Sequence, residues 1–187
     1  MRRSAALFCL VLVAGCSHQD STGVVAGSAP AAPVVRPMPV DSARLLGAGG
    51  DGDNWLTYGR TYDEQRFSPL QQINAGNVAG LKPAWHFDLP VDARAQESTP
   101  LIIDGVMYLT AAWSRVFALN AATGALLWSY DPQVPGHTGI DACCDVANRG
   151  LAAWQGRVYL GTLDGRLIAL DAATGKPVWD VSTVPAG

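Results

Sequence analysis

The chain has 187 residues, of which 49% are hydrophobic and 16% are charged, and its formal net charge at pH 7 is -3. A mildly acidic chain with scattered basic residues has no positive surface for a phosphate backbone, which excludes nucleic acid as a partner. Its length suits one small folded domain together with terminal segments.

The first predicted element is a lipoprotein signal peptide at residues 1–15. Two arginines precede an apolar stretch, Ala5–Ala14, that is too short to span a bilayer as a stable helix. The stretch ends in the letters LVAGC, which resemble the lipobox of bacterial lipoproteins. The resemblance implies lipidation of Cys16 and a periplasmic protein anchored to a bacterial membrane by lipid. An ordinary cleaved signal with an incidental cysteine is the alternative.

Residues 16–50 are predicted to form a lipidated, disordered linker rich in Pro, Ala and Gly. The segment has no aromatic side chain, and all six tryptophans of the chain lie after it. Such a segment buries too little apolar surface to offset the entropy lost when its backbone is ordered. We therefore expect a flexible tether that leads into a folded region at residues 51–187.

The folded region contains a repeat with an offset of 51 residues. The letters ALNAATG at 118–124 match ALDAATG at 169–175, and a tryptophan follows each copy, at Trp128 and Trp179. Repeats of this period are typical of propellers, solenoids and arrays. Short runs of β-branched and aromatic residues alternate with turns such as Asp104-Gly105, which favours four strands per repeat. The pattern predicts an all-β fold made of blades.

The letters ALDAATGKPVW at 169–179 resemble the tryptophan-docking motif of quinoprotein dehydrogenase propellers. The resemblance implies that the tryptophan of one blade packs on the glycine turn of the next, and glycine does allow that close approach. LKPAW at 81–85 resembles the end of an earlier, degenerate copy, and residues 55–70 resemble the segment that precedes the first blade in the alcohol dehydrogenase branch. We expect a truncated, partial eight-bladed β-propeller of the quinoprotein type, with about two blades after this lead-in segment.

The letters ACCDVANRG at 142–150 resemble a cofactor-binding segment of quinoprotein alcohol dehydrogenases. The resemblance implies a vicinal disulfide between Cys143 and Cys144 that lies against one face of pyrroloquinoline quinone (PQQ). It also implies that Arg149 pairs with a PQQ carboxylate, for which a guanidinium is well suited. Two free thiols are the alternative for the cysteines, and a surface arginine or a structural ion pair with Asp145 is the alternative for Arg149.

Glu97 immediately precedes a predicted strand that begins at Leu101. The resemblance implies that this glutamate contacts the cofactor, because the family has a cofactor-contacting glutamate just before the first strand of a blade. Loops at one end of a rigid scaffold commonly carry ligand contacts. A solvated loop glutamate is the alternative.

Taken together, the resemblance implies a PQQ- and calcium-dependent dehydrogenase that oxidises a small alcohol to an aldehyde. Electrons would pass to a cytochrome c or a quinone. In the family the catalytic aspartate and the calcium ligands come from later blades, so we assign no catalytic or metal-binding residue here and expect this chain alone to be inactive. The alternative is a non-catalytic, lipid-anchored propeller scaffold of the outer-membrane assembly type, which would have no use for the four cofactor residues Glu97, Cys143, Cys144 and Arg149.

Overall fold

The computed structural model describes residues 35–91 and 96–185. All of them belong to one unit, Ala32–Gly187. The predicted signal peptide at 1–15, the predicted lipidation site Cys16 and the first part of the predicted linker lie outside the described residues. Within the described part of the chain, no helix has the length and apolar character needed to cross a membrane.

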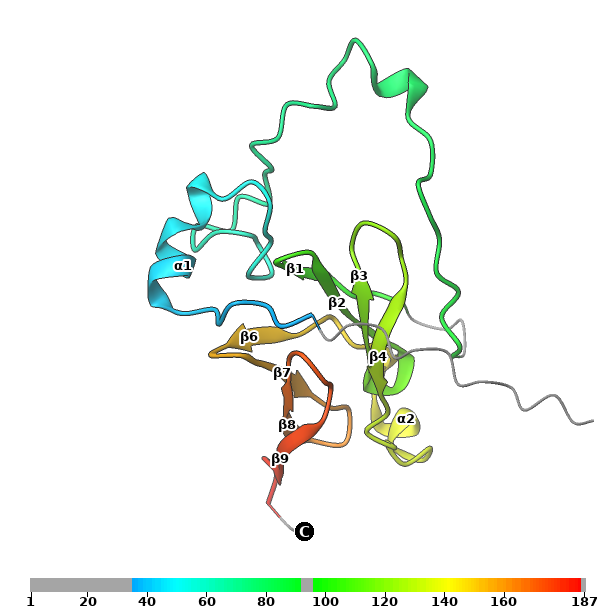
Figure 1. The fold of residues 1–187 in the computed structure, drawn as a ribbon. Coiled ribbons are helices and arrows are strands. Elements are labelled where there is room, and N and C mark those ends of the chain that lie inside the picture. The colour runs from blue at the N-terminus through cyan, green and yellow to red at the C-terminus, as the bar shows by residue number, and fades with distance from the viewer. Residues whose placement is uncertain (1–34, 92–95, 186–187) are drawn as a thin grey trace, which may run out of the picture. The chain divides into compact units, whose positions relative to one another are not determined.

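Two four-stranded antiparallel sheets make up the β structure (Figure 1). In each sheet the strands follow one another in chain order, so every strand pairs with its neighbours in sequence. This is the meander expected of a propeller blade. The first blade consists of β1 (Leu101–Ile103), β2 (Val106–Ala111), β3 (Arg115–Asn120) and β4 (Leu126–Tyr130). The second consists of β6 (Ala152–Trp154), β7 (Arg157–Gly161), β8 (Arg166–Asp171) and β9 (Pro177–Ser182).

The remaining elements of the described residues are short, and all but the 3-10 turn Ala112–Ser114, which lies inside the first blade, come before or between the blades. A helix, α1 (Ser42–Gly47), precedes the first blade, and the connection from β4 to β6 carries α2 (Thr138–Asp141) and the strand β5 (Cys143–Val146). Three 3-10 turns complete the set, at Ala48–Gly50, Val78–Gly80 and Ala112–Ser114.

The predicted docking of tryptophans on glycine turns is confirmed at two places. Trp128 of β4 lies over Gly175 of the second blade, where a Cβ atom would overlap the indole ring, and its Nε1 donates to the Ala172 carbonyl at 3.0 Å. Trp85 lies over Gly124 of the first blade in the same way. Both glycines have positive φ, +72° for Gly124 and +70° for Gly175, which a residue with a Cβ adopts only at a cost.

Tyr108 of β2 lies in the core between the two blades. Its ring is fully buried and lies 5.8 Å from the Trp128 ring, measured between centroids. Its hydroxyl donates to the Ala172 carbonyl at 2.9 Å. Burial, followed by the charges of Asp171 and Asp104, raises the pKa of Tyr108 well above its usual value, so the hydroxyl stays a donor at all ordinary pH values. The strand residues of both sheets thus share one apolar cluster.

The predicted disordered linker at 16–50 is wrong over its last part. Val40 and Ala48 are buried, at 2% and 3% exposure, and Asp41 caps α1 by accepting the backbone N–H of Arg44 at 2.9 Å. Arg44 also forms an ion pair with Asp104 of the first blade at 2.9 Å. The segment cannot make a core of its own, but it packs on the core that the strands provide, and composition alone does not reveal such a surface.

A second anchor holds the end of this segment. Arg60 is only 5% exposed, and its Nη2 donates to the carbonyls of Ala48, Gly49 and Asp51 at 2.9, 3.2 and 2.9 Å. A buried guanidinium that satisfies carbonyls at the end of a helical turn keeps those polar groups from being orphaned. The folded region therefore begins before Asp51, the boundary that the sequence predicts.

Candidate cofactor site

The candidate cofactor residues lie on two connections at the edge of the first blade. Glu97 lies in the loop before β1, whereas Cys143 and Cys144 begin β5 and Arg149 stands just before β6. The strand β5 belongs to neither four-stranded sheet, and its last residue, Val146, is buried, so β5 is held by this packing and by the anchoring of the β4–β6 connection.

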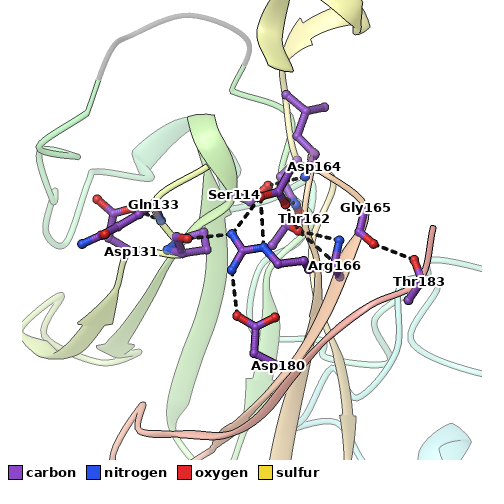
Figure 2. A network of polar contacts seen from close by, with 12 residues as sticks. Ser114, Asp131, Gln133, Thr162, Asp164, Gly165, Arg166, Asp180 and Thr183 are labelled. Carbon is purple, nitrogen blue, oxygen red and sulfur yellow. Dashed lines mark hydrogen bonds and ion pairs between the residues drawn. The ribbon is translucent and has the colours of Figure 1, made fainter. Parts of the chain in front are cut away.

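Arg166 of β8 anchors the start of that connection. Its guanidinium donates to the Pro132 carbonyl at 2.7 Å and also binds Asp164 and Asp180 (Figure 2). Burial acts to raise the pKa of Asp164, but hydrogen bonds from Arg166 and Thr162 and the charge of Arg166 outweigh it and lower the pKa. Arg166 therefore stays paired at neutral pH and holds the first residues after β4 against the second blade.

The structure brings Glu97 and Arg149 together. Glu97 Oε2 lies 3.0 Å from Arg149 Nη2, although the residues are separated by a complete blade in the sequence. Both side chains remain accessible, with 46% of Glu97 and 61% of Arg149 exposed. An exposed pair of this kind adds little to stability, so its polar groups are available to a ligand.

The two cysteines are exposed and lie next to Arg149. Their Sγ atoms are 2.7 Å apart and both residues are free thiols in the structure. A disulfide bond is shorter, about 2.05 Å. The vicinal disulfide therefore stays a prediction, and the geometry shows only that the sulfur atoms are adjacent.

Hydrogen bonds polarise the sulfur pair. The hydrogen bond between the two thiols raises the pKa of Cys143 and lowers that of Cys144, and the Arg149 guanidinium lowers the pKa of Cys144 further. The contact with Cys144 and the charge of Glu97 in turn raise the pKa of Arg149. Arg149 therefore acts more strongly on Cys144 than on Cys143, and the four predicted cofactor residues interact as one cluster.

A hollow of about 470 Å³ lies beside Arg149. Its walls include Asn148 and Gly150 on either side of Arg149, and Tyr58 from the lead-in segment. Sequence reasoning missed Tyr58 and Asn148. The position of Asn148 next to Arg149 in the motif could have indicated it. An asparagine, however, is equally common in a pocket wall and in a solvated loop, so its residue type does not indicate its role.

The donor set fits a flat molecule that carries carboxylates. An accessible guanidinium can receive a carboxylate, Glu97 can accept an N–H or O–H, and the paired sulfurs offer a soft, apolar surface. Among the described residues no group of three or more His, Cys, Asp or Glu side chains could hold a metal ion. The cluster thus suits an organic anion.

The two blades joined by docked tryptophans define the chain as part of a β-propeller. A family model described as the β-propeller domain of glucose, ethanol and alcohol dehydrogenases, named PQQ, matches residues 55–183. This match covers more than half of the sequence. The chain therefore belongs to the family of PQQ-dependent alcohol dehydrogenase propellers.

Individual relatives agree with this assignment. The chain is 64% identical over 132 residues to the dehydrogenase subunit of a quinone alcohol dehydrogenase from Komagataeibacter europaeus, covering 71% of the chain and 18% of the relative. It is 52% identical over 147 residues to the quinohemoprotein alcohol dehydrogenase ADH-IIG of Pseudomonas putida, covering 79% of the chain and 20% of the relative. The chain thus spans about a fifth of the length of these relatives.

The fold agrees with a solved relative as well. The structure of the quinohemoprotein alcohol dehydrogenase ADHIIG from Pseudomonas putida HK5 superposes with a TM-score of 0.78 at 51% sequence identity. The match covers 81% of this chain and 22% of that one. The predicted propeller architecture is therefore confirmed for the two blades present.

Proposed function

We propose that this chain supplies the first blades of a PQQ-dependent alcohol dehydrogenase and that its cofactor residues hold one side of PQQ. The observation that carries the proposal is the ion pair between Glu97 and Arg149, which come from two distant connections and meet at 3.0 Å. A bound PQQ would supply the ortho-quinone that accepts a hydride from an alcohol.

Each residue of the cluster has a distinct role in this proposal. The Arg149 guanidinium binds a PQQ carboxylate and keeps its charge in a partly dry site. Glu97 orients the cofactor by accepting a hydrogen bond, and it also holds Arg149 in place at 3.0 Å when the site is free. Cys143 and Cys144, joined as a vicinal disulfide, offer a flat face for stacking.

The wider assignments are proposals about a longer enzyme. Names of the relatives support a small alcohol as substrate and a quinone or cytochrome c as electron acceptor, since they include a quinone alcohol dehydrogenase subunit and a cytochrome c 1-butanol dehydrogenase. We propose that calcium acts as Lewis acid, with its ligands and the catalytic aspartate on other blades. We also propose periplasmic export and lipid anchoring through Cys16.

Direct binding of PQQ to the full 187-residue chain tests the proposal, with quenching of tryptophan fluorescence as the readout. Arg149→Ala should weaken binding by about tenfold or more, because one charged hydrogen bond is lost. Arg115→Ala is the matched control, since Arg115 forms a comparable exposed ion pair with Asp131 at 2.8 Å. Equal affinity for Arg149→Ala and the natural chain would refute the assignment of Arg149, and no PQQ binding by the natural chain would favour the scaffold alternative.

Activity is tested in a complete propeller. Residues 55–183 of this chain replace the matching segment of the Pseudomonas putida quinohemoprotein alcohol dehydrogenase, to which the chain is 52% identical. The chimera should oxidise alcohols with PQQ and calcium, and Arg149→Ala in the chimera should lose most of that activity. A folded chimera that takes up PQQ but shows no turnover would contradict the proposal.

Mass spectrometry tests the disulfide. The exported chain, alkylated without reductant, should carry no label on Cys143 or Cys144, and both should be labelled after reduction. Labelling of both residues before reduction would show that the thiols are free and would remove the stacking surface from the proposal.

A further inference from the structure

A network of polar side chains lies directly behind the cofactor cluster. Two of its members are sequence neighbours of candidate cofactor residues: Ser98 follows Glu97, and Asn148 precedes Arg149. Thr110 and Ser114 of the first blade complete the network, and both are fully buried. The exposed residues Glu97 and Arg149 are therefore one peptide bond away from the partly buried residues Ser98 and Asn148.

Thr110 joins the two connections. Its Oγ1 donates to the Asn148 carbonyl at 3.0 Å and lies 3.1 Å from Ser98 Oγ. Its backbone N–H donates to Ser98 Oγ at 2.9 Å. One buried threonine on β2 thus contacts both the residue after Glu97 and the residue before Arg149.

Asn148 joins the two blades. Its Nδ2 donates to Ser114 Oγ of the first blade at 3.1 Å and to the Gly161 carbonyl of the second at 2.8 Å. Its Oδ1 accepts the Gly150 N–H at 3.1 Å, which shapes the backbone around Arg149. The amide is used at both ends, so its orientation is well defined.

The backbone next to the cofactor residues is paired as well. Thr99 and Gly150 form an isolated parallel bridge, in which the Thr99 N–H donates to the Arg149 carbonyl at 3.1 Å. Gly150 has φ of +133°, and a Cβ there would lie 2.9 Å from the Thr99 carbonyl oxygen. The two connections therefore run side by side in a fixed register.

We propose that Thr110 and Asn148 are positioning residues that set the separation of Glu97 and Arg149 and so place the guanidinium for a bound cofactor carboxylate. The inference rests on the proposed function, because it explains how the protein holds Glu97 and Arg149 at the separation that PQQ binding would require. Thr110 is fully buried and acts through Ser98 and the Asn148 carbonyl, whereas Asn148 lines the hollow beside Arg149 and acts on the Arg149 backbone through its hydrogen bonds. Fixed supporting residues of this kind are what hold a binding group in its productive geometry.

The thiol pair provides a readout of this positioning that is independent of PQQ. Cys143 and Arg149 lower the pKa of Cys144 by hydrogen bonding, while the charge of Glu97 acts in the opposite direction. If Arg149 moves away from Cys144, the pKa of Cys144 should rise and its thiolate should form at higher pH. The rate of alkylation against pH, measured on the reduced chain, reports this change.

The test uses Thr110→Val, which keeps the shape and removes the hydroxyl, Asn148→Ala, and Thr110→Ser, which restores the hydroxyl. Thr110→Val and Asn148→Ala should move the alkylation profile to higher pH and weaken PQQ binding by about tenfold, the cost of a misplaced charged hydrogen bond. Thr110→Ser should behave like the natural chain in both assays.

Tyr108→Phe is the structural control. It removes a fully buried hydrogen bond to the Ala172 carbonyl, between the blades and away from the cofactor cluster. It should lower the urea midpoint and leave the alkylation profile and the PQQ affinity unchanged. Equal shifts in Tyr108→Phe, or an unchanged alkylation profile in both Thr110→Val and Asn148→Ala, would overturn the inference. If the natural chain binds no PQQ, the proposed function fails, and the alkylation profiles alone decide the positioning role.

Discussion

Two regions of the molecule differ in the interactions that they use: the seam where the two blades meet, and the cluster of candidate cofactor residues. At the seam, made by Trp128, Gly175, Tyr108 and Ala172, the fully buried Tyr108 and the partly buried Trp128 both donate to one backbone carbonyl. In the cofactor cluster, charged side chains and thiols are exposed and contact each other directly. Burial of large rings stabilises a fold, whereas accessible charge is worth little for stability and is free to meet a ligand. The comparison predicts that substitutions at the seam will lower stability, whereas substitutions in the cofactor cluster will weaken binding and leave stability nearly unchanged.

The largest loss of stability is expected from Gly175→Ala. The new Cβ has a positive φ and would overlap the Trp128 ring, so the indole must leave its position. We expect a loss of about 3 kcal/mol, near the lower end of the cost of removing a buried aromatic contact. Gly156→Ala is the matched control, since Gly156 also has positive φ, at +76°, but no atom lies within 4 Å of its Cβ position. That control should lose only about 1 kcal/mol from backbone strain. Equal losses in urea unfolding would show that the docking contributes nothing.

Trp128→Phe should have a smaller effect on the seam. The ring remains, but the hydrogen bond from Nε1 to the Ala172 carbonyl is lost. Because Tyr108 still donates to that carbonyl, no buried acceptor is left unpaired, and we expect a loss of about 1–2 kcal/mol. Urea unfolding measures it, and a loss as large as that of Gly175→Ala would mean that the hydrogen bond, not the packing, dominates.

In the cofactor cluster, Arg149→Ala should change thiol chemistry and leave stability nearly unchanged. The guanidinium lowers the pKa of Cys144, so its removal raises that pKa and reduces the thiolate present at neutral pH. Alkylation of the reduced chain at pH 7 should slow by about threefold, and the difference should disappear at a pH above both thiol pKa values. Arg115→Ala should alkylate like the natural chain. Faster alkylation in Arg149→Ala would contradict the assigned contact.

The smallest change in stability is expected from Glu97→Gln. The side chain keeps its shape and loses its charge, and the ion pair with Arg149 is exposed on both sides. We expect no measurable change in the urea midpoint and a clear loss of PQQ affinity. A large loss of stability would place this pair with the seam rather than with the binding site.

The local pattern of the sequence was sufficient for the blades. The repeated segments at 118–124 and 169–175 predict the strands, the glycine turns and the docked tryptophans, and the structure confirms them. The candidate cofactor residues were also predicted by resemblance, but the contact between Glu97 and Arg149 was not. No sequence feature places Glu97 at 3.0 Å from Arg149, because that distance depends on how a whole blade folds between them.

The ordered part of the predicted linker shows the same limit. Val40 belongs to the apolar cluster that the strands form, and Ala48 is buried, although the Pro-, Ala- and Gly-rich composition around them predicts no core. The Thr110–Asn148 contact could not be predicted from the sequence either, because the Thr110 hydroxyl on β2 donates to a carbonyl that lies 38 residues later in the chain.

The sequence by itself determined the repeat, the turn chemistry and the residue types of the site, because these depend on neighbours along the chain. Only the tertiary structure decided which segments outside the repeat are ordered and which distant side chains meet. Those outcomes depend on the surfaces that folding creates, and a surface exists only after the strands have paired and packed.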